Sequence, residues 1–185
     1  MNDNNYLSVK NEITTIYNEL STLLESFKTN LTDENMDKIM LKVLNTLGNA
    51  ARADRCFIWK NYYLKDSQIL CMKQIYEWTN EIYPVQDTEL VENILYEPDL
   101  YDILSSGQPF NAIVKDLDDY NRGILEAQDI KSILCVPIHI EGEFWGFIGL
   151  DNCQTEELWS YYEVNMLISV SLTIGQIIKK SKFKS

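Results

Sequence analysis

Residues 133–140 read Ile-Leu-Cys-Val-Pro-Ile-His-Ile, residues 141–143 read Glu-Gly-Glu, and residues 144–151 read Phe-Trp-Gly-Phe-Ile-Gly-Leu-Asp. The two longer runs are apolar and rich in residues that favour strands, and the short run between them carries a glycine suited to a tight turn. They predict a β-hairpin. Neither run alternates apolar with polar residues, which indicates strands buried on both faces. The sheet is therefore expected to be covered by helices.

Helices are predicted on either side of this hairpin in the sequence. Residues 117–128 form a short helical stretch before it. After it, Ser160 and Glu163 have the spacing of a capping box, and Trp159 and Val164 have the spacing of a hydrophobic staple. A long C-terminal helix is therefore expected to begin at this point.

The hairpin and its flanks resemble the GAF domain family. The residues that carry the resemblance are Ser132, Val136-Pro-Ile138, Gly142 and Gly146-Phe-Ile-Gly-Leu-Asp151. With Glu143, Trp159, Ser160 and Glu163 added, the segment is similar to the GAF domains that lie upstream of bacterial histidine kinases and diguanylate cyclases. The resemblance covers most of the chain.

The fold implied by the resemblance is α+β, layered α/β/α. Its centre is expected to be an antiparallel sheet of five or six strands. The N-terminal helix, a second helix expected to begin after the N-cap Thr32, and the C-terminal helix would cover one face. A lid of short helices and loops would cover the other. The first two strands are predicted at residues 55–62 and 69–78 from their apolar, β-favouring composition. Residues 79–108 contain two prolines and a glycine and are expected to be irregular.

Three regions are predicted along the chain: an amphipathic N-terminal helix (1–31), the GAF domain (32–180) and a basic tail (181–185). Apolar residues of the first region recur at steps of four and three, which is heptad spacing. They are Val9, Ile13, Ile16, Leu20, Leu23 and Phe27. This stripe either packs on the protein's own body or joins two copies. A similar stripe on the C-terminal helix consists of Val164, Leu167, Ser171, Ile174 and Ile178. Together the stripes predict a homodimer.

The resemblance also implies a ligand pocket between the lid and the sheet. Small-molecule pockets combine apolar walls with a few polar groups, and ten residues expected on the lid side have this composition. The predicted ligand-binding residues are Tyr76, Trp78, Phe110, Asn111, Ala112, Tyr120, Ile124, Leu125, Leu134 and Val136. Aromatic residues are also common core fillers, so a filled interior is an equal alternative. An error of one residue in strand phase would turn the strand side chains to the other face.

Composition excludes several classes of protein. The 185 residues carry a net charge of -12, which argues against nucleic acid as a partner. No apolar run approaches the roughly 20 residues of a membrane span, and the polar start Met1–Asn5 is no signal peptide. The expected location is the cytoplasm, without direct membrane insertion.

The chain lacks the usual motifs for metals and cofactors. Its four cysteines form no Cys-x-x-Cys pair, and His139 is its single histidine. Bilin-binding GAF domains, which resemble phytochromes, carry a cysteine followed by histidine and an Asp-Ile-Pro segment, and both are absent here. No cofactor is therefore predicted, and the protein is expected to be colourless.

A sensory role is the leading hypothesis for function. In it, an unknown small molecule or a partner shifts the lid and the terminal helices, which pass the change to an output domain in the same chain, such as a histidine kinase or a diguanylate cyclase. The chain itself is predicted not to be an enzyme. One alternative is a GAF-type free methionine sulfoxide reductase using Cys71, Cys135 or Cys153. The other is a dimerisation scaffold without a ligand.

Overall fold

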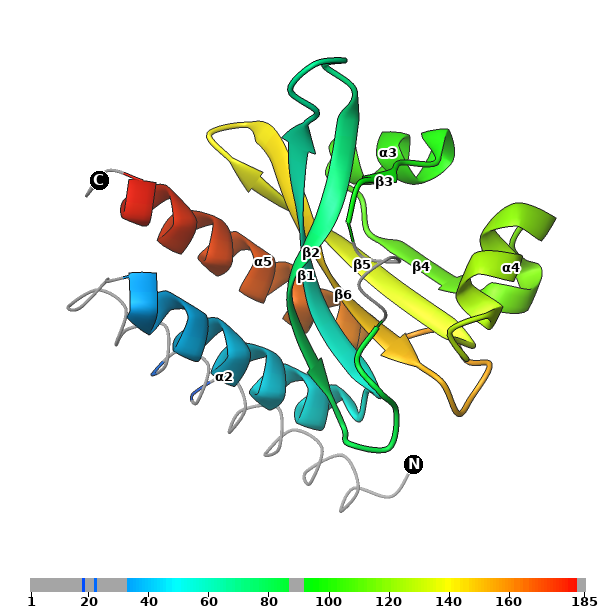
Figure 1. Cartoon of the computed structure of the whole chain (residues 1–185). Coiled ribbons are helices and arrows are strands. Elements are labelled where there is room, and N and C mark those ends of the chain that lie inside the picture. The colour runs from blue at the N-terminus through cyan, green and yellow to red at the C-terminus, as the bar shows by residue number, and fades with distance from the viewer. Residues whose placement is uncertain (1–17, 19–21, 23–32, 87–91, 183–185) are drawn as a thin grey trace.

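The structure is a computed structural model that describes residues 33–86 and 92–182, together with Asn18 and Thr22. Within these residues six strands form one sheet in the order β3-β2-β1-β6-β5-β4, and every pairing is antiparallel. Two long helices cover one face, and two short helices lie toward the other (Figure 1). The predicted layered α+β fold is confirmed. The N-terminal helix predicted for residues 1–31 falls outside the described residues.

The element boundaries follow the predicted ones closely. The helices are α2 (Asp33–Ala51), α3 (Pro98–Ser105), the 3-10 turn η2 (Val114–Asp116), α4 (Asp119–Glu126) and α5 (Tyr161–Lys182). The strands are β1 (Arg55–Tyr63), β2 (Leu70–Thr79), β3 (Ile94–Leu95), β4 (Phe110–Ile113), β5 (Ser132–Ile140) and β6 (Glu143–Asn152). The two-residue strand β3, inside the segment expected to be irregular, and the 3-10 turn η2 had no counterpart in the sequence prediction.

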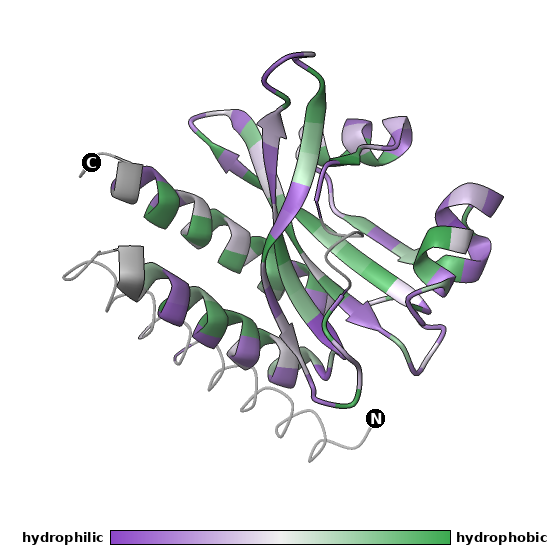
Figure 2. Ribbon diagram, in the orientation of Figure 1, coloured by the Kyte–Doolittle hydropathy of each residue, from purple (hydrophilic) through white to green (hydrophobic). Residues whose placement is uncertain are grey.

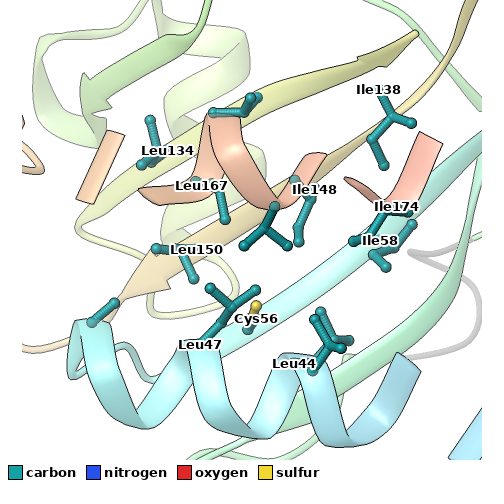
Figure 3. Close-up of a cluster of buried hydrophobic side chains, with 14 of the residues drawn as sticks. Leu44, Leu47, Cys56, Ile58, Leu134, Ile138, Ile148, Leu150, Leu167 and Ile174 are labelled. Carbon is teal, nitrogen blue, oxygen red and sulfur yellow. The ribbon is translucent and has the colours of Figure 1, made fainter. Parts of the chain in front are cut away.

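The main core lies between the sheet and the pair α2 and α5, on what we call the helix face. Its side chains come from both helices and from the three central strands (Figure 3). They include Leu44, Leu47, Cys56, Ile58, Leu134, Ile138, Ile148, Leu150, Leu167 and Ile174. In Figure 2 the apolar residues of α2 follow one side of the helix and the polar residues follow the other. This distribution is that of an amphipathic helix packed on a sheet.

Helix α2 continues through Gly48, although glycine is a poor helix former. The structure supplies a reason for a glycine inside a helix. A Cβ at Gly48 would stand 2.0 Å from the indole ring of Trp78 on β2. Gly48 therefore lets the large Trp78 ring lie directly against the helix backbone, and this packing offsets the lower helix propensity of glycine.

Helix α5 begins with the predicted capping box. The Ser160 backbone N–H donates to Glu163 Oε2 at 2.6 Å, and the Glu163 N–H donates to Ser160 Oγ at 3.5 Å. Trp159 is buried in the helix-face core, and Val164 packs against it. Two orphan N–H groups at the helix start are thereby satisfied.

The predicted contact stripe of α5 faces the protein's own sheet. Leu167 and Ile174 are fully buried, Ser171 is 2% exposed, and Val164 and Ile178 pack against the same core. The expectation that this stripe joins two copies is wrong, because the sheet already covers it. The outward side of α5 still carries Leu172, which is 63% exposed. The N-terminal stripe lies outside the described residues.

Among the helices that the structure describes, none combines the length and apolar character needed to cross a membrane.

Candidate functional site

The lid face of the sheet carries a second apolar cluster, which we call the lid-face cluster. Strands β1, β2, β5 and β6 supply its floor, while α3, η2 and the loops around α4 supply its cover. Its buried members are Phe57, Trp59, Met72, Leu104, Val114, Ile130, Ile133, Cys135, Phe147 and Cys153. Trp59 and Phe147 stack with ring centroids 6.0 Å apart, and Tyr96 and Phe144 meet at 5.8 Å. Aromatic rings thus form one wall of the lid face.

In the middle of the sheet surface under the lid, the ring of Phe57 lies very close to the backbone of Gly149. A Cβ at Gly149 on β6 would stand 2.2 Å from the ring of Phe57 on the neighbouring strand. The glycine therefore allows the Phe57 ring to lie flat across the sheet. Beside this ring, the paired residues Arg55 and Asp151 bring two ionisable groups into the apolar interior.

Arg55, the first residue of β1, connects the sheet to two lid segments. The residue is buried, with 3% of its surface exposed. The guanidinium donates from Nε to the Pro84 carbonyl oxygen at 3.2 Å and from Nη1 to the Gln128 carbonyl oxygen at 3.0 Å. It also lies over the Tyr83 ring, 5.8 Å from the centroid. Arg55 therefore holds the loops on either side of the lid against the end of the sheet.

Its sequence neighbour Asp54 closes the same end of the sheet. The fully buried Asp54 carboxylate accepts hydrogen bonds from the Cys153 backbone N–H, the Asn80 side chain and the Gln154 side chain, at 2.6 to 2.7 Å. A buried carboxylate with three donors is well satisfied. Asp54 is therefore a structural anchor between β1 and the chain that leaves β6.

Asp151, opposite Arg55 in the β1–β6 pairing, has a different environment. It is fully buried, and neither carboxyl oxygen has a hydrogen-bond donor within the described part of the chain. Burial raises the pKa of Asp151 to about 8, against the opposing pull of Arg55 and with smaller contributions from Glu77 and Asp54. At neutral pH Asp151 is therefore mostly a neutral acid, able to donate a hydrogen bond.

Other buried polar groups on the lid face also have unused hydrogen-bonding capacity. Within the described residues, Gln74 Oε1 and Gln86 Oε1 are buried and accept no hydrogen bond. Gln74 stands opposite Trp59 in the β1–β2 pairing, so the two share the lid face. Burial raises the pKa of Glu77, whose carboxylate accepts a hydrogen bond from the Gln86 backbone N–H. Unpaired polar groups beside an apolar wall are typical of a small-molecule site.

The ten predicted ligand-binding residues are divided between the two faces. Phe110, Ala112 and Leu125 pack against the lid-face cluster, as expected. Tyr120 and Ile124 lie on α4 but point outward, with 62% and 42% of their surface exposed. The side chains of the other five residues do not face the lid.

Four of the predicted residues lie on the helix face, so the expectation that all ten line one pocket is wrong. They are Tyr76, Trp78, Leu134 and Val136. Tyr76 donates through its hydroxyl to Asp37 of α2 at 2.7 Å, and Trp78 packs on Gly48. Strand β5 is buried on both faces, so its sequence has no alternation to set the phase. In β2 the extra residue Ile75, between the Ile58–Tyr76 and Trp59–Gln74 pairs, shifts the phase of the strand. For the residues on the lid side, ligand binding stays a prediction.

Asn111, the tenth predicted residue, connects β4 to the C-terminal helix. Its Nδ2 donates to the Trp159 carbonyl oxygen at 2.9 Å, and the Trp159 N–H donates to its Oδ1 at 3.2 Å. Both ends of the amide are therefore used just before α5 begins. Since β4 lies between α3 and α4 in the chain, Asn111 joins the lid directly to α5.

The cysteines do not have the environment of a reactive site. Cys56, Cys71, Cys135 and Cys153 are all buried and free. Burial raises the pKa of Cys56 and of Cys135, and it raises that of Cys153 to about 12. A nucleophilic thiol needs a lowered pKa and access. The geometry therefore gives no support to the sulfoxide reductase alternative.

Sequence reasoning missed the polar residues of the lid face: Arg55, Gln74, Glu77 and Gln86. The sequence does contain one indication, because two charged residues, Asp54 and Arg55, stand at the start of a buried apolar strand. Charged residues at such a position are rarely buried without a specific partner. For the glutamines, only the fold reveals that they face the lid.

The comparisons with known proteins agree with this architecture. The sequence matches the GAF domain family over residues 35–178. It is 38% identical over 159 residues to the methanogenesis regulatory histidine kinase FilI of Methanothrix harundinacea, a match that covers 84% of this chain and 18% of the relative. This chain thus corresponds to less than a fifth of that protein.

Solved structures resemble the fold at low sequence identity. The phycocyanobilin-bound GAF domain of a cyanobacterial phytochrome superposes with a TM-score of 0.69 at 15% identity, over 89% of this chain and 96% of that chain. The PixJ GAF domain of Thermosynechococcus elongatus in its blue-light absorbing form gives a TM-score of 0.65 at 14% identity, over 84% and 92%. The likeness concerns the fold alone. With a family match over most of its length, this chain belongs to the GAF domain family.

Proposed function

We propose that this GAF domain is the sensory module of a signal-transduction protein. In this proposal a small molecule binds between the lid and the sheet, and α5 together with the N-terminal helix relays binding to an output domain of the histidine kinase or diguanylate cyclase type. The proposed location is the cytoplasm. The similarity to a segment of a regulatory histidine kinase supports the output class.

The single observation that carries the relay is the Asn111 contact. The side-chain amide of Asn111 forms hydrogen bonds through both Nδ2 and Oδ1 to the backbone of Trp159, one residue before the capping box of α5. Movement of β4 with the lid would therefore pull on the start of α5. This contact would couple ligand binding to α5 only if the domain has two arrangements and the ligand binds them with different affinity.

The ligand is proposed to contact the unpaired polar groups of the lid face. Gln74 Oε1 and Gln86 Oε1 offer acceptors, and Asp151 in its neutral form offers a donor. Trp59, Phe147 and other rings of the cluster would form the apolar wall. A site of this composition suits a flat or partly apolar metabolite with both donors and acceptors.

Binding can be tested by thermal shift and native mass spectrometry on the intact chain, with a panel of amino acids, organic acids, nucleotides and tetrapyrroles. We expect at least one compound to raise the melting temperature by several degrees, since binding to the folded state alone stabilises by about 2.7 kcal/mol at a hundred times Kd. The replacement Gln74→Leu should abolish this shift, because it removes a buried acceptor of the site.

The matched control is Gln108→Leu, at an exposed position beside α3. It should leave the shift unchanged. If no compound in the panel stabilises the protein, and no copurifying molecule is detected, the alternative of an unliganded scaffold gains the advantage.

We also propose that two copies associate through the N-terminal and C-terminal helices, with α5 using its outward side. Leu172 is the largest exposed aliphatic side chain there. Light scattering of the intact chain should give twice the chain mass, and Leu172→Glu should weaken the dimer by about tenfold or more, since a buried charge without a partner is costly. Leu95→Glu, at a residue 59% exposed on β3, is the control and should stay dimeric. A monomeric intact chain would contradict the proposal.

A further inference from the structure

A groove of about 660 Å³ opens on the helix face, on the opposite side of the sheet from the lid. It lies between the beginning of α2 and the end of α5, and the sheet forms its floor. Met36, Met40, Ile58, Ile75, Ile174 and Ile178 supply its apolar walls. Ile58 and Ile174 lie at one end of the main core (Figure 3). The volume is that of a small-molecule site.

Two lysines border this groove at a position that is unfavourable for like charges. Lys60 of β1 and Lys73 of β2 are direct partners in the strand pairing, so their side chains project next to each other from the same face of the sheet. Like charges at such a position destabilise a sheet. Lys60 lies over the Trp145 ring and Lys73 over the Tyr62 ring. Within the described residues neither ammonium has a carboxylate within ion-pair distance.

The indole of Trp145 borders the same groove. Trp145 contributes to its wall, and its indole Nε1 is buried without an acceptor in the described part of the chain. Two carboxylates also line the groove: Asp37 accepts from the Tyr76 hydroxyl within it, and Glu77 accepts from the Gln86 N–H.

From this combination we propose that the groove binds an amphipathic organic anion: a carboxylate on an apolar body. The carboxylate would bridge Lys60 and Lys73 and remove their repulsion, and the apolar part would lie along the methionines and isoleucines. The chain carries a net charge of -12, so two cations without counterions are a local exception to its overall acidity. Because the ligand would touch both α2 and α5, it would fix the spacing of these two helices at the end of α5.

This second site is independent of the lid pocket, and one experiment separates the two. Isothermal titration calorimetry on the intact chain would use decanoate, decyltrimethylammonium and decanol as probes below their micelle concentrations. We expect decanoate to bind, and the two probes without a negative charge to bind at least tenfold more weakly. The lid variant Gln74→Leu should leave decanoate affinity unchanged.

The decisive variant is Lys60→Gln with Lys73→Gln, which should weaken decanoate binding by about tenfold or more, as expected for the loss of a charge-assisted hydrogen bond. The same variant should melt at or above the temperature of the unmodified protein, because it relieves repulsion. A control with equal charge change, Lys42→Gln with Lys65→Gln, alters two exposed residues and should bind as before. Trp145→Phe, which removes the N–H donor together with part of the aromatic wall, should weaken binding severalfold.

Several results would overturn the proposal. Decanoate and decyltrimethylammonium binding equally would mean that the groove selects apolar surface alone. Dissociation of a dimer by decanoate would assign the groove to a second copy of the chain. Binding to phosphatidylglycerol vesicles without binding to soluble decanoate would assign the lysines to a membrane surface.

Discussion

Replacing Asp151 by Asn is expected to remove most of a steep loss of stability between pH 4 and pH 8. In the folded protein burial raises the pKa of Asp151 to about 8, whereas an unfolded aspartate has a pKa of about 3.9. Between these values the folded state holds a proton that the unfolded state has released. Stability therefore falls as pH rises, by about 1.4 kcal/mol per pH unit from this group alone.

Urea unfolding at several pH values from 4 to 8 provides the measurement. The two proteins should be similarly stable near pH 4, and the Asn variant should be more stable by several kcal/mol near pH 8. Arg55, Glu77 and Asp54 face the same carboxyl and are unchanged in both proteins, so the difference between the curves isolates Asp151. Glu157→Gln, at an exposed residue, should leave the curve in place. An Asn variant that is less stable above pH 5 would mean that Arg55 outweighs burial and keeps Asp151 ionised.

The replacement Gly48→Ala is expected to destabilise the protein, although alanine is the better helix former. Helix propensity alone predicts a gain of about 1 kcal/mol. A Cβ at Gly48 would, however, stand 2.0 Å from the Trp78 ring. The indole must shift within a packed core, and overpacking of this kind costs about 1–3 kcal/mol. We expect chemical denaturation to report a net loss of about 1–2 kcal/mol.

Gly123 of α4 provides the matched control, because nothing lies within 4 Å of a Cβ built there. Gly123→Ala should stabilise the protein by about 0.4–1 kcal/mol. A double-mutant cycle adds a second check: with Trp78→Leu already present, Gly48→Ala should cost little or become favourable. If both glycine replacements stabilise equally, Trp78 does not require the glycine.

Local patterns predicted the elements because their causes are local. The capping box at Ser160 and Glu163 forms with the expected partners. The β5–β6 hairpin forms across Glu141 and Gly142, which both adopt positive φ as a tight turn requires. Each of these features depends on residues a few positions apart, so the sequence contains all of the information.

The assignment of residues to the two faces was less predictable. Strand β5 is buried along nearly its whole length, so Leu134 and Cys135 look alike in sequence, yet they lie on opposite faces. The candidate site suffered from this ambiguity, because Tyr76, Trp78, Leu134 and Val136 turned out to face the helices. The same holds for the stripe on α5, whose apolar spacing does not distinguish contact with a sheet from contact with another copy.

The sequence by itself therefore determined the family, the order of the elements and the layered α+β fold, since periodicity and turn chemistry act over short distances. Tertiary structure alone decided which side chains share a space. It placed Arg55 opposite Asp151, and it brought Lys60 beside Lys73 above an apolar groove. It also joined Asn111 to the start of α5 across 48 positions of sequence. Strand register and the packing of distant segments govern these contacts, and no single segment encodes them.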